Sequence, residues 1–382
     1  MRIALLTYST KPRGGVVHTL ALAEALATMG HDVTVGTLGR SGDRVFFRDV
    51  DPRVRLQVVP FPAGPDEETV GERIVRSIAV LRDGLDLDGF DIVHAQDCIS
   101  SNACEGAVRT VHHLDTFTTE QLIACHDRAV REPAALVCVS KSVAAEVARE
   151  YGRVATVIPN GVDAARFARA AGETEDAMAA RARWTDRLGR YVLAVGGIEP
   201  RKGTIDLLAA YDRLRSAPGT ENVRLVLAGG ETLFDYRPYR AAFDAMVAER
   251  AIPVTELGVV PDPDLPSLMA AAAAFSFVST KEGFGLAATE ALAAGVPVVA
   301  RDLPVLREVF GPTVRYAADV DDIARGLRSA VGDPVDPAAG RALAARYSWP
   351  AAAAAHVALY ERLRENAGGS PVGRTRRTSL HV

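Results

Sequence analysis

The first forty residues alternate between apolar runs and a helical repeat. Residues 2–8 form an apolar run of β character, which ends in the polar, glycine-containing segment 9–15. Apolar side chains then recur at steps of four, three and four residues, the period of one helix face: Val16, Leu20, Ala23 and Ala27. Gly30 closes this segment, and residues 32–38 resume as a strand. This order predicts the βαβ unit that opens a doubly wound parallel sheet.

The same alternation continues along the chain. Further strand candidates in the first half lie at residues 54–59, 91–95, 108–112, 135–139 and 156–159. A second βαβ unit begins with the strand candidate 191–196 and a helix over 204–214, and later strand candidates lie at 223–228, 254–260, 274–279, 296–299 and 314–317. Short apolar runs joined by longer segments are typical of parallel strands with crossover helices. We therefore expect an α/β fold with two doubly wound, Rossmann-like domains.

The length of 382 residues is too great for one ordinary core. We assign residues 1–168 to the first domain and residues 186–349 to the second. The segment 168–190 is rich in Ala, Arg, Glu and Asp and lacks a strand signal, so we expect it to contain the first crossing between the domains. Residues 366–382 are rich in Gly, Ser and Arg, and we expect a disordered tail there.

Composition argues against several classes of protein. A formal net charge of −4 and the lack of a basic stripe argue against a nucleic-acid partner. No apolar run reaches the ~18 residues of a membrane span, and the N-terminal run is too short for a signal peptide. The four cysteines lack the paired spacing of zinc ligands, so we expect buried thiols in a reducing, cytoplasmic compartment and no metal site: Cys98, Cys104, Cys125 and Cys138.

Residues 281–300 contain more candidate ligand-binding residues than any other segment of this length. We expect Glu282 to lie on a loop, and a helix to begin at Leu286 and to end at Gly295, where a C′ glycine belongs. Glu290 lies in that helix, eight positions after Glu282, and eight helical residues rise roughly 12 Å. That span suits one extended ligand with hydroxyl groups at both ends.

The turn between the two glutamates is suited to contact the middle of such a ligand. Gly283 and Gly285, on either side of Phe284, allow a close backbone approach, and the helix N-terminus at Leu286 offers N–H groups to an anion. A ligand with phosphates in its middle and hydroxyls at its ends is a nucleotide sugar. The spacing of two glutamates alone would favour a simpler interpretation, with one glutamate solvated on the surface and the other in a helix ion pair. The glycines and the strand that follows favour a ligand-binding site instead.

Two cations stand before the helix of the second βαβ unit. Arg201 and Lys202 follow a strand and precede a helix N-terminus, where N–H groups and the macrodipole already favour an anion. An arginine fork and a lysine point charge could hold a diphosphate there. Exposed cations are common on any surface, but this position favours phosphate binding.

Histidines lie at the C-terminal end of a first-domain strand. His112 and His113 end the candidate 108–112, with Asp115 close behind, and ligands bind at such strand ends in open α/β sheets. An imidazole can accept or donate a proton near neutral pH. A buried histidine bonded to backbone would show the same pattern, and the roles of His113 and Asp115 stay open.

A basic and aromatic stretch follows the second strand of the first domain. It could contact an acidic acceptor or a membrane surface, although a solvated loop is the simpler interpretation. Its members are Arg40, Arg44, Phe46, Phe47, Arg48 and Arg53.

Glu282 and Glu290 with seven residues between them, within EGFGL and ahead of EALAAGVPVVA, resemble the signature of glycosyltransferase family 4. The resemblance implies that Glu282 contacts the transferred sugar and that Glu290 holds the ribose hydroxyls. It also implies that Gly15 lies in a glycine loop against the donor phosphates. By position in T-x-H, His112 is similar to the family's active-site histidine beside the donor sugar.

The resemblance covers nearly all of residues 1–365. It implies a GT-B fold, in which the two domains face a central cleft and a C-terminal helix over 350–365 packs back on the first domain. It also implies a retaining, metal-independent reaction without a cofactor. One departure is Gly196-Gly197, where relatives often carry Gly-Arg, and Arg201 is expected to supply the missing phosphate contact.

These observations predict a hexosyltransferase-type enzyme that moves a sugar, with retention, from a nucleotide diphosphate sugar to a hydroxyl acceptor of unknown identity. The nearer alternative is a GT-B sugar-nucleotide epimerase or phosphorylase. A second alternative is a sugar-nucleotide-binding protein without catalysis. The loops of the first domain carry no motif that identifies an acceptor, so sugar, lipid, small metabolite and protein acceptors all stay open.

Overall fold

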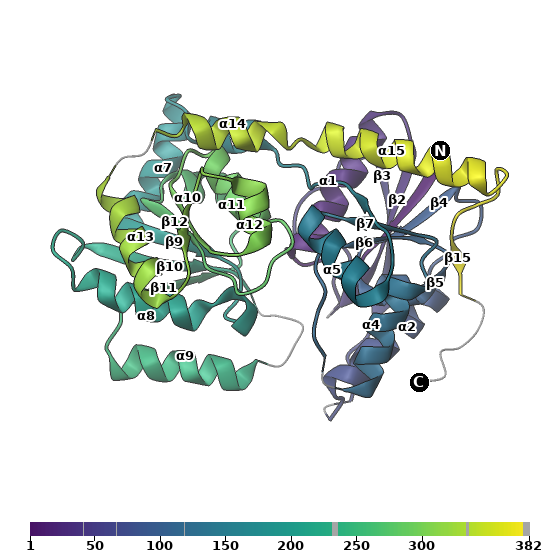
Figure 1. Ribbon diagram of the computed structural model, residues 1–382, viewed down its shortest axis with the longest axis horizontal. Coiled ribbons are helices and arrows are strands. Elements are labelled where there is room, and N and C mark those ends of the chain that lie inside the picture. Colours follow the sequence, from purple (N-terminus) through teal and green to yellow (C-terminus); the bar gives the residue numbers. More distant parts are fainter. Residues whose placement is uncertain (41, 66, 118, 231–235, 334–335, 377–382) are drawn as a thin grey trace. The chain divides into compact units, whose positions relative to one another are not determined.

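The structure, a computed structural model, describes residues 1–382 except 41, 66, 118, 231–235, 334–335 and 377–382 (Figure 1). The chain forms two compact units. The first unit comprises Met1–Gly161 and Trp349–Val382, and the second comprises Val162–Ser348. The chain therefore leaves the first unit after Gly161 and not near residue 168, and it returns at Trp349.

The first unit contains a seven-stranded sheet in the order β3-β2-β1-β4-β6-β7-β8. Every neighbouring pair in this sheet is parallel. The order reverses between β1 and β4, which is the position where ligands bind in doubly wound sheets. The strands are β1 (Arg2–Leu6), β2 (Asp32–Arg40), β3 (Val54–Phe61), β4 (Ile92–Ala95), β6 (Val108–Val111), β7 (Ala135–Cys138) and β8 (Thr156–Val157).

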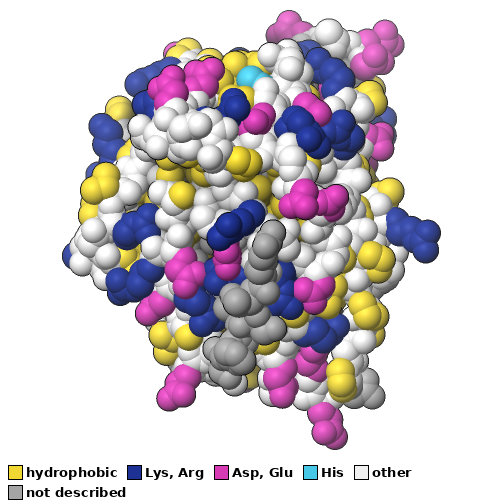
Figure 2. Space-filling model, turned by 90° about the vertical axis from the view of Figure 1, so that its right-hand side faces the viewer, with side chains coloured by type: hydrophobic (Ala, Val, Ile, Leu, Met, Phe, Trp, Pro, Cys, Tyr) yellow, Lys and Arg dark blue, Asp and Glu magenta, His cyan; other side chains and the backbone are white. Residues whose placement is uncertain are grey.

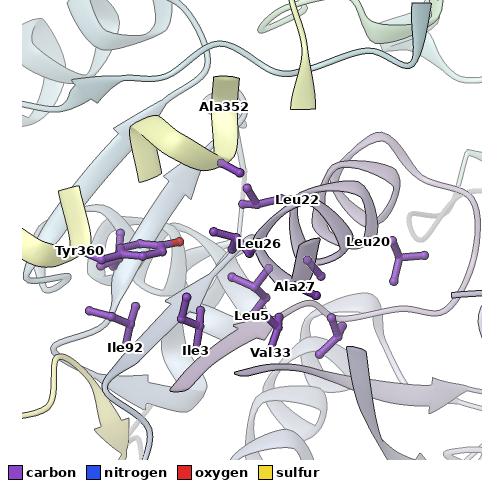
Figure 3. Close-up of a cluster of buried hydrophobic side chains, with 14 of the residues drawn as sticks. Ile3, Leu5, Leu20, Leu22, Leu26, Ala27, Val33, Ile92, Ala352 and Tyr360 are labelled. Atoms are coloured by element: carbon purple, nitrogen blue, oxygen red, sulfur yellow. The ribbon is translucent and has the colours of Figure 1, made fainter. Parts of the chain in front are cut away.

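Helices cover the faces of this sheet (Figure 1). They are α1 (Gly14–Thr28), α2 (Val70–Gly84), α3 (Cys98–Ala103), α4 (Glu120–Arg131), α5 (Lys141–Tyr151) and α15 (Trp349–Asn366). Figure 3 shows how α15 joins the core: Tyr360 lies near Ile3 and Ile92, and Ala352 lies near Leu22 of α1. The last long helix of the chain thus completes the core that the first strands begin.

The segment after α15 is ordered up to residue 376 and is not a disordered tail. Val372 is 6% exposed, donates its N–H to the Asp91 oxygen at 2.9 Å, and accepts from the Val93 N–H at 2.8 Å. The short strand β15 (Arg374–Thr375) then pairs antiparallel with β5 (Cys104–Glu105). Its Gly and Arg content resembles that of a tail, but backbone pairing with the start of β4 and with β5 orders it. The rest of the expected tail, residues 377–382, lies outside the described residues.

The second unit contains a six-stranded parallel sheet in the order β11-β10-β9-β12-β13-β14. The order reverses between β9 and β12, so this sheet also has a switch point. The strands are β9 (Arg190–Val195), β10 (Val223–Ala228), β11 (Val254–Gly258), β12 (Ala274–Phe277), β13 (Val298–Arg301) and β14 (Arg315–Ala317). The prediction of two doubly wound α/β sheets is confirmed.

The helices of the second unit include short turns that carry site residues. They are α6 (Ala164–Ala170), α7 (Glu175–Leu188), the 3-10 turn η1 (Pro200–Lys202), α8 (Thr204–Arg215), α9 (Arg237–Glu249), the 3-10 turn η2 (Asp262–Asp264), α10 (Leu265–Ala270), α11 (Leu286–Ala293), α12 (Pro304–Phe310), α13 (Val320–Gly332) and α14 (Ala338–Arg346).

The segment expected to link the domains is instead largely the helix α7. Thr174 caps its N-terminus by accepting from the Ala177 N–H, and Gly189 ends it. Trp184 donates its indole N–H to Ser267 of α10 at 3.0 Å. The helix-forming alanines and arginines therefore build part of the second unit.

Candidate active site

A cluster of charged side chains lies at the switch point of the second unit, where β9 and β12 end. Lys202 Nζ donates to Glu282 Oε1 at 2.7 Å, and Arg201 Nη1 donates to the same oxygen at 3.2 Å. Arg201 Nη2 donates to Glu199 Oε1 at 3.0 Å. We call these four side chains, Glu199, Arg201, Lys202 and Glu282, the charge cluster. The sequence analysis identified three of its members and missed Glu199.

Backbone contacts fix the two loops that carry the charge cluster. The Thr280 N–H donates to the Arg201 oxygen at 2.7 Å, which ties the loop after β12 to η1. Gly203 ends η1 with a φ of +64°, and a Cβ placed on it would lie 2.4 Å from the Val278 oxygen. Only glycine suits both this conformation and this close approach. The side chains of η1 are therefore held beside Glu282 by main-chain geometry.

Glu282 is an anion throughout the neutral range. Its side chain is only 11% exposed, and burial acts to raise its pKa, but the charges of Lys202 and Arg201 outweigh burial and lower the pKa to about 2. In the ligand-free protein the two cations are thus already engaged by carboxylates. A bound diphosphate would share them with Glu282 or take them over.

A small, solvent-open hollow adjoins the charge cluster at the ends of β9 and β12. It is lined by Ala194, Val195, Gly196, Gly197, Lys202, Thr204, Leu207, Leu227, Ser276, Phe277, Val278 and Ser279. The stem of Lys202 packs against Gly196, where a Cβ would lie 3.2 Å from Lys202 Cε. Because Gly196 has no side chain, the stem of Lys202 can lie along the wall of the hollow.

The helix α11 presents an uncapped N-terminus. Its N-cap residue, Gly285, has a φ of +98°, makes no side-chain cap, and is followed by no acidic residue in the first turn, so N–H groups at Leu286 and beyond stay available to an anion. The side chain of Phe284 is 3% exposed and stacks edge-on against Tyr347 at 5.0 Å. It belongs to the core, so only its backbone is available for the ligand contact expected of Phe284.

Glu290 differs from Glu282 in its charge. Burial raises the pKa of Glu290 to about 8, Arg166 opposes the shift, and Asp262 and Asp163 add to it. Arg166 is itself bound by Asp262, with Nη2 and Oδ2 2.8 Å apart. Glu290 is therefore mostly protonated at neutral pH and can donate as well as accept a hydrogen bond. The sequence analysis missed Arg166 and Asp262 because both are distant from the motif along the chain.

In the first unit the structure brings Gly15 and His112 together. His112 follows β6, and a Cβ placed on Gly15 would lie 3.7 Å from both Cδ2 and Nε2 of His112. Burial, with smaller contributions from His113 and Arg109, lowers the pKa of His112 to about 3, so the imidazole is neutral. Its Nε2 makes no hydrogen bond within the described part of the chain.

A buried group of histidines that the sequence did not predict lies behind His112. The His18 ring packs edge-on against the His112 ring at 4.8 Å, and His18 Nδ1 lies 2.9 Å from Asn160 Oδ1. His94 joins Thr110 and Tyr360 by hydrogen bonds of 2.8 and 2.6 Å. These contacts join α1, β4 and α15 and fix the orientation of the His112 ring.

The other titratable residues near His112 pair with one another. His113 Nε2 lies 3.1 Å from Asp115 Oδ1.

Over the described ranges, no group of three or more His, Cys, Asp or Glu side chains is placed to hold a metal ion, and all four cysteines are unpaired thiols. No helix in the same ranges is long and apolar enough to cross a membrane.

Much of the basic and aromatic stretch is engaged within the first unit. Phe46 is 6% exposed, and Phe47 packs against the same core cluster, so neither ring is presented to a bilayer. Arg48 pairs with Glu24 at 2.6 Å, and Arg53 pairs with Asp51 at 2.7 Å. Figure 2 shows one face of the molecule, on which basic and acidic side chains are interspersed. The fold thus engages four of the six residues of the stretch, and its contact with an acidic acceptor or a membrane surface stays a prediction.

The two sheets, the two glycines in the first turn of α1 and the charge cluster define a two-domain glycosyltransferase. Residues 12–166 match the family described as "Glycosyltransferase Family 4", and residues 185–345 match "Glycosyl transferases group 1". The chain belongs to glycosyltransferase family 4, with the GT-B fold. The chain is similar to a glycogen synthase of Mycobacterium tuberculosis, at 30% identity over 410 residues that cover 94% of each chain.

A second relative and a solved structure agree with this assignment. An MMP α-(1→4)-mannosyltransferase of Mycolicibacterium hassiacum is 28% identical over 439 residues, which cover 95% of this chain and 98% of the relative. The crystal structure of Anabaena HepE in complex with UDP and glucose has a TM-score of 0.67 and 19% identity, and covers 96% of this chain and 99% of that one. The structural likeness shows the shared fold.

Proposed function

We propose that the enzyme transfers a hexose from a nucleotide diphosphate sugar to a hydroxyl group, with retention of the anomeric configuration. The observation that carries this proposal is the charge cluster at the switch point of the second unit, beside the uncapped N-terminus of α11. Cations and free N–H groups at a switch point favour a diphosphate. The HepE structure with UDP and glucose supports the choice of ligand.

Departure of the diphosphate is the demanding step. Arg201, Lys202 and the N–H groups of α11 would stabilise the negative charge that grows on the leaving group. Loss of one such preorganised donor typically costs on the order of a hundredfold or more in rate. These protein cations supply the charge neutralisation, and we propose no metal or cofactor in this step.

Glu282 and Glu290 take different roles in this proposal. The Glu282 carboxylate, once the diphosphate engages its two cations, orients the hydroxyls of the sugar and offsets the charge of an oxocarbenium-like centre. Glu290 binds the ribose hydroxyls from α11. Because it is mostly protonated without ligand, it can donate a proton to one ribose oxygen while it accepts from the other.

His112 is assigned a binding role from the first unit. Its neutral imidazole, close against Gly15, offers an unpaired Nε2 to a sugar hydroxyl. Its depressed pKa means that it acts as a hydrogen-bond partner and not as an imidazolium. We also propose a cytoplasmic location, which the four unpaired thiols support.

Donor turnover in Glu282→Ala tests the proposal. We expect wild-type protein to consume at least one nucleotide sugar in the presence of an acceptor mixture, and Glu282→Ala to lose a hundredfold or more of that rate. Glu249→Ala, at the exposed end of α9, serves as the matched control and should keep the wild-type rate. An epimerised donor or a sugar 1-phosphate as product would instead identify an epimerase or a phosphorylase. Tight nucleotide-sugar binding without turnover would identify a binding protein.

A further inference from the structure

Glu199 is the one member of the charge cluster without a role in the proposed reaction. It directly precedes η1 and is only 8% exposed. Its carboxylate accepts from Arg201 Nη2 at 3.0 Å, and its main-chain oxygen accepts from the Lys202 N–H at 3.0 Å. Glu199 therefore contacts both residues that supply the cations, one through its side chain and the other through its backbone.

The backbone between Glu199 and Arg201 is short and stiff. Pro200 is the first residue of η1, and its ring fixes φ at about −65°. The Arg201 oxygen accepts from the Thr280 N–H at 2.7 Å and from the Thr280 hydroxyl at 3.3 Å. Because the main chain of Arg201 is held in this way, its guanidinium can move only by rotation about side-chain bonds, and the contact with Glu199 restricts that rotation.

The guanidinium of Arg201 is divided between two loops. Nη2 donates to Glu199, whereas Nη1 lies 3.2 Å from Glu282 Oε1 and 3.4 Å from the Lys281 oxygen. Glu282 Oε1 also accepts from Lys202 Nζ at 2.7 Å. The two cations thus converge on one carboxylate oxygen, and Glu199 holds the other edge of the guanidinium.

The second carboxylate limits how Arg201 can pair with Glu282. Arginine and a carboxylate prefer a fork in which two N–H groups meet both oxygens. Without Glu199, Arg201 can turn both terminal nitrogens toward Glu282 and form that fork. Such a pair would bind the guanidinium more tightly to Glu282 and leave less of it for a diphosphate.

We propose that Glu199 is a positioning residue of the diphosphate site. It keeps one edge of the Arg201 guanidinium in place while the other edge passes from Glu282 to an oxygen of the bound diphosphate. A largely buried ion pair adds little net stability, so orientation is the effect that this contact best explains. The inference rests on the proposed function, because it needs a diphosphate at the charge cluster.

Calorimetric titration of the full-length protein with UDP, GDP, ADP, CDP and dTDP tests the inference. For the nucleoside diphosphate that wild type binds most tightly, we expect Glu199→Ala to raise the Kd fivefold or more. Glu199→Gln keeps an oxygen that can accept from Arg201, so it should raise the Kd less. Asp212→Ala removes a similar partner from Arg215 at the far end of α8 and should match wild type.

The direction of the change separates orientation from charge. A carboxylate beside an anion site also repels the anion. If Glu199 acted only through its charge, Glu199→Ala would lower the Kd, which is the opposite of the expected result.

A double-mutant cycle shows whether Glu199 acts through Arg201. In the Arg201→Gln background, Glu199→Ala should change the Kd less than twofold, because no guanidinium is left to orient. An equal loss of binding in both backgrounds would contradict the inference and show that Glu199 serves the fold of η1. If Glu199→Ala does not fold, Glu199→Gln carries the same cycle, with an expected loss of twofold or more.

The remaining outcomes distinguish this inference from the proposed function. Wild-type protein that binds none of the five nucleoside diphosphates would contradict the proposed function and, with it, the role of Glu199. Wild-type protein that binds one of them as tightly as Glu199→Ala does, or less tightly, would contradict the positioning role alone.

Discussion

Two glutamates eight positions apart in one motif have opposite protonation states at neutral pH. Both side chains are withdrawn from water, which favours the neutral acid. Lys202 and Arg201 reverse this for Glu282 and lower its pKa to about 2, whereas burial dominates at Glu290 and raises its pKa to about 8. The cation near Glu290 is Arg166, which is already paired with Asp262. Environment, not residue type, therefore assigns one glutamate to charge stabilisation and the other to hydrogen bonding.

The raised pKa of Glu290 predicts how stability depends on pH. The folded state binds a proton at Glu290 that the unfolded state releases near pH 4.5, so this residue contributes a loss of stability as pH rises from about 4.5 to about 8. Glu290→Gln removes that loss. We expect the free energy of unfolding of Glu290→Gln, relative to wild type, to increase from pH 5 to pH 8 and then to level off.

Urea unfolding at a series of pH values measures this difference. Glu249→Gln, an exposed substitution of the same kind, should show no such trend. A relative stability of Glu290→Gln that is constant or falls over this range would show that Glu290 is ionised in the folded protein. The same variant should bind nucleoside diphosphates more weakly, because it loses a ribose contact.

At this scale the sequence predicted which side chains carry the chemistry better than it predicted their partners. Arg201, Lys202 and Glu282 were identified from their positions between strands and helices, and the structure brings them together. Their mutual pairing across about eighty positions of chain depends on the parallel register of β9 and β12, which no local pattern encodes. Glu199 pairs with Arg201 only two positions away, and the local pattern gave no reason to single it out.

Among the elements, α11 depends most closely on a single backbone conformation. Gly285 starts the helix from the left-handed region, and a Cβ placed there would lie 2.8 Å from Cζ of Phe310 and 3.2 Å from Cε1 of Phe277. The two aromatic rings, from α12 and β12, leave no room for a side chain. This close packing sets the direction in which the N–H groups of α11 point.

Gly285→Ala should therefore destabilise the protein through both strain and crowding. A left-handed alanine alone costs about 1 kcal/mol, and overpacking typically adds about 1–3 kcal/mol. Gly152→Ala provides a matched control, since Gly152 has a φ of +65° but no atom within 4 Å of its added Cβ. We expect thermal or urea unfolding to show a loss for Gly285→Ala that clearly exceeds the loss for Gly152→Ala. Equal losses would mean that the aromatic rings adjust freely.

Strands were predicted more reliably than helices from this sequence. Short, mostly buried runs rich in Val, Thr and Leu, such as 108–111 and 223–228, stand out locally because both faces of a parallel strand are covered. In contrast, α7 buries only Leu188 fully, so its sequence lacks a strong apolar stripe and was interpreted as a linker. Its place is set by contacts with α6 and α10, which are tertiary information.

On the scale of the whole molecule, the chain crosses from the first unit to the second and returns to complete the first. Trp349 begins α15, and the segment after this helix pairs with the start of β4 and with β5. Tyr360 is fully buried and hydrogen-bonded to His94, the histidine of β4. The core of the first unit thus includes C-terminal residues, although more than 180 residues of the second unit intervene in the sequence.

Val372→Asp tests how much the final segment contributes. Burial of a valine side chain is worth about 1.5–3 kcal/mol, and a carboxylate at the same place adds a desolvation cost. We expect a loss of at least about 2 kcal/mol in the free energy of unfolding. The same substitution at Val154, which is 89% exposed, should change it by less than about 0.5 kcal/mol. Equal effects of the two variants would show that residues after α15 are not needed for the first unit.

The central claim is that the charge cluster of the second unit binds the diphosphate of a sugar donor. Calorimetric titration of nucleoside diphosphates into wild-type protein and Lys202→Met measures this most directly, because methionine keeps the stem that packs on Gly196 and removes only the charge. We predict saturable binding of at least one nucleoside diphosphate and a tenfold or greater rise in Kd, about 1.4 kcal/mol, in Lys202→Met. Lys141→Met, an exposed change on α5, should match wild type. An unchanged Kd in Lys202→Met, or no binding by wild type, would contradict the claim.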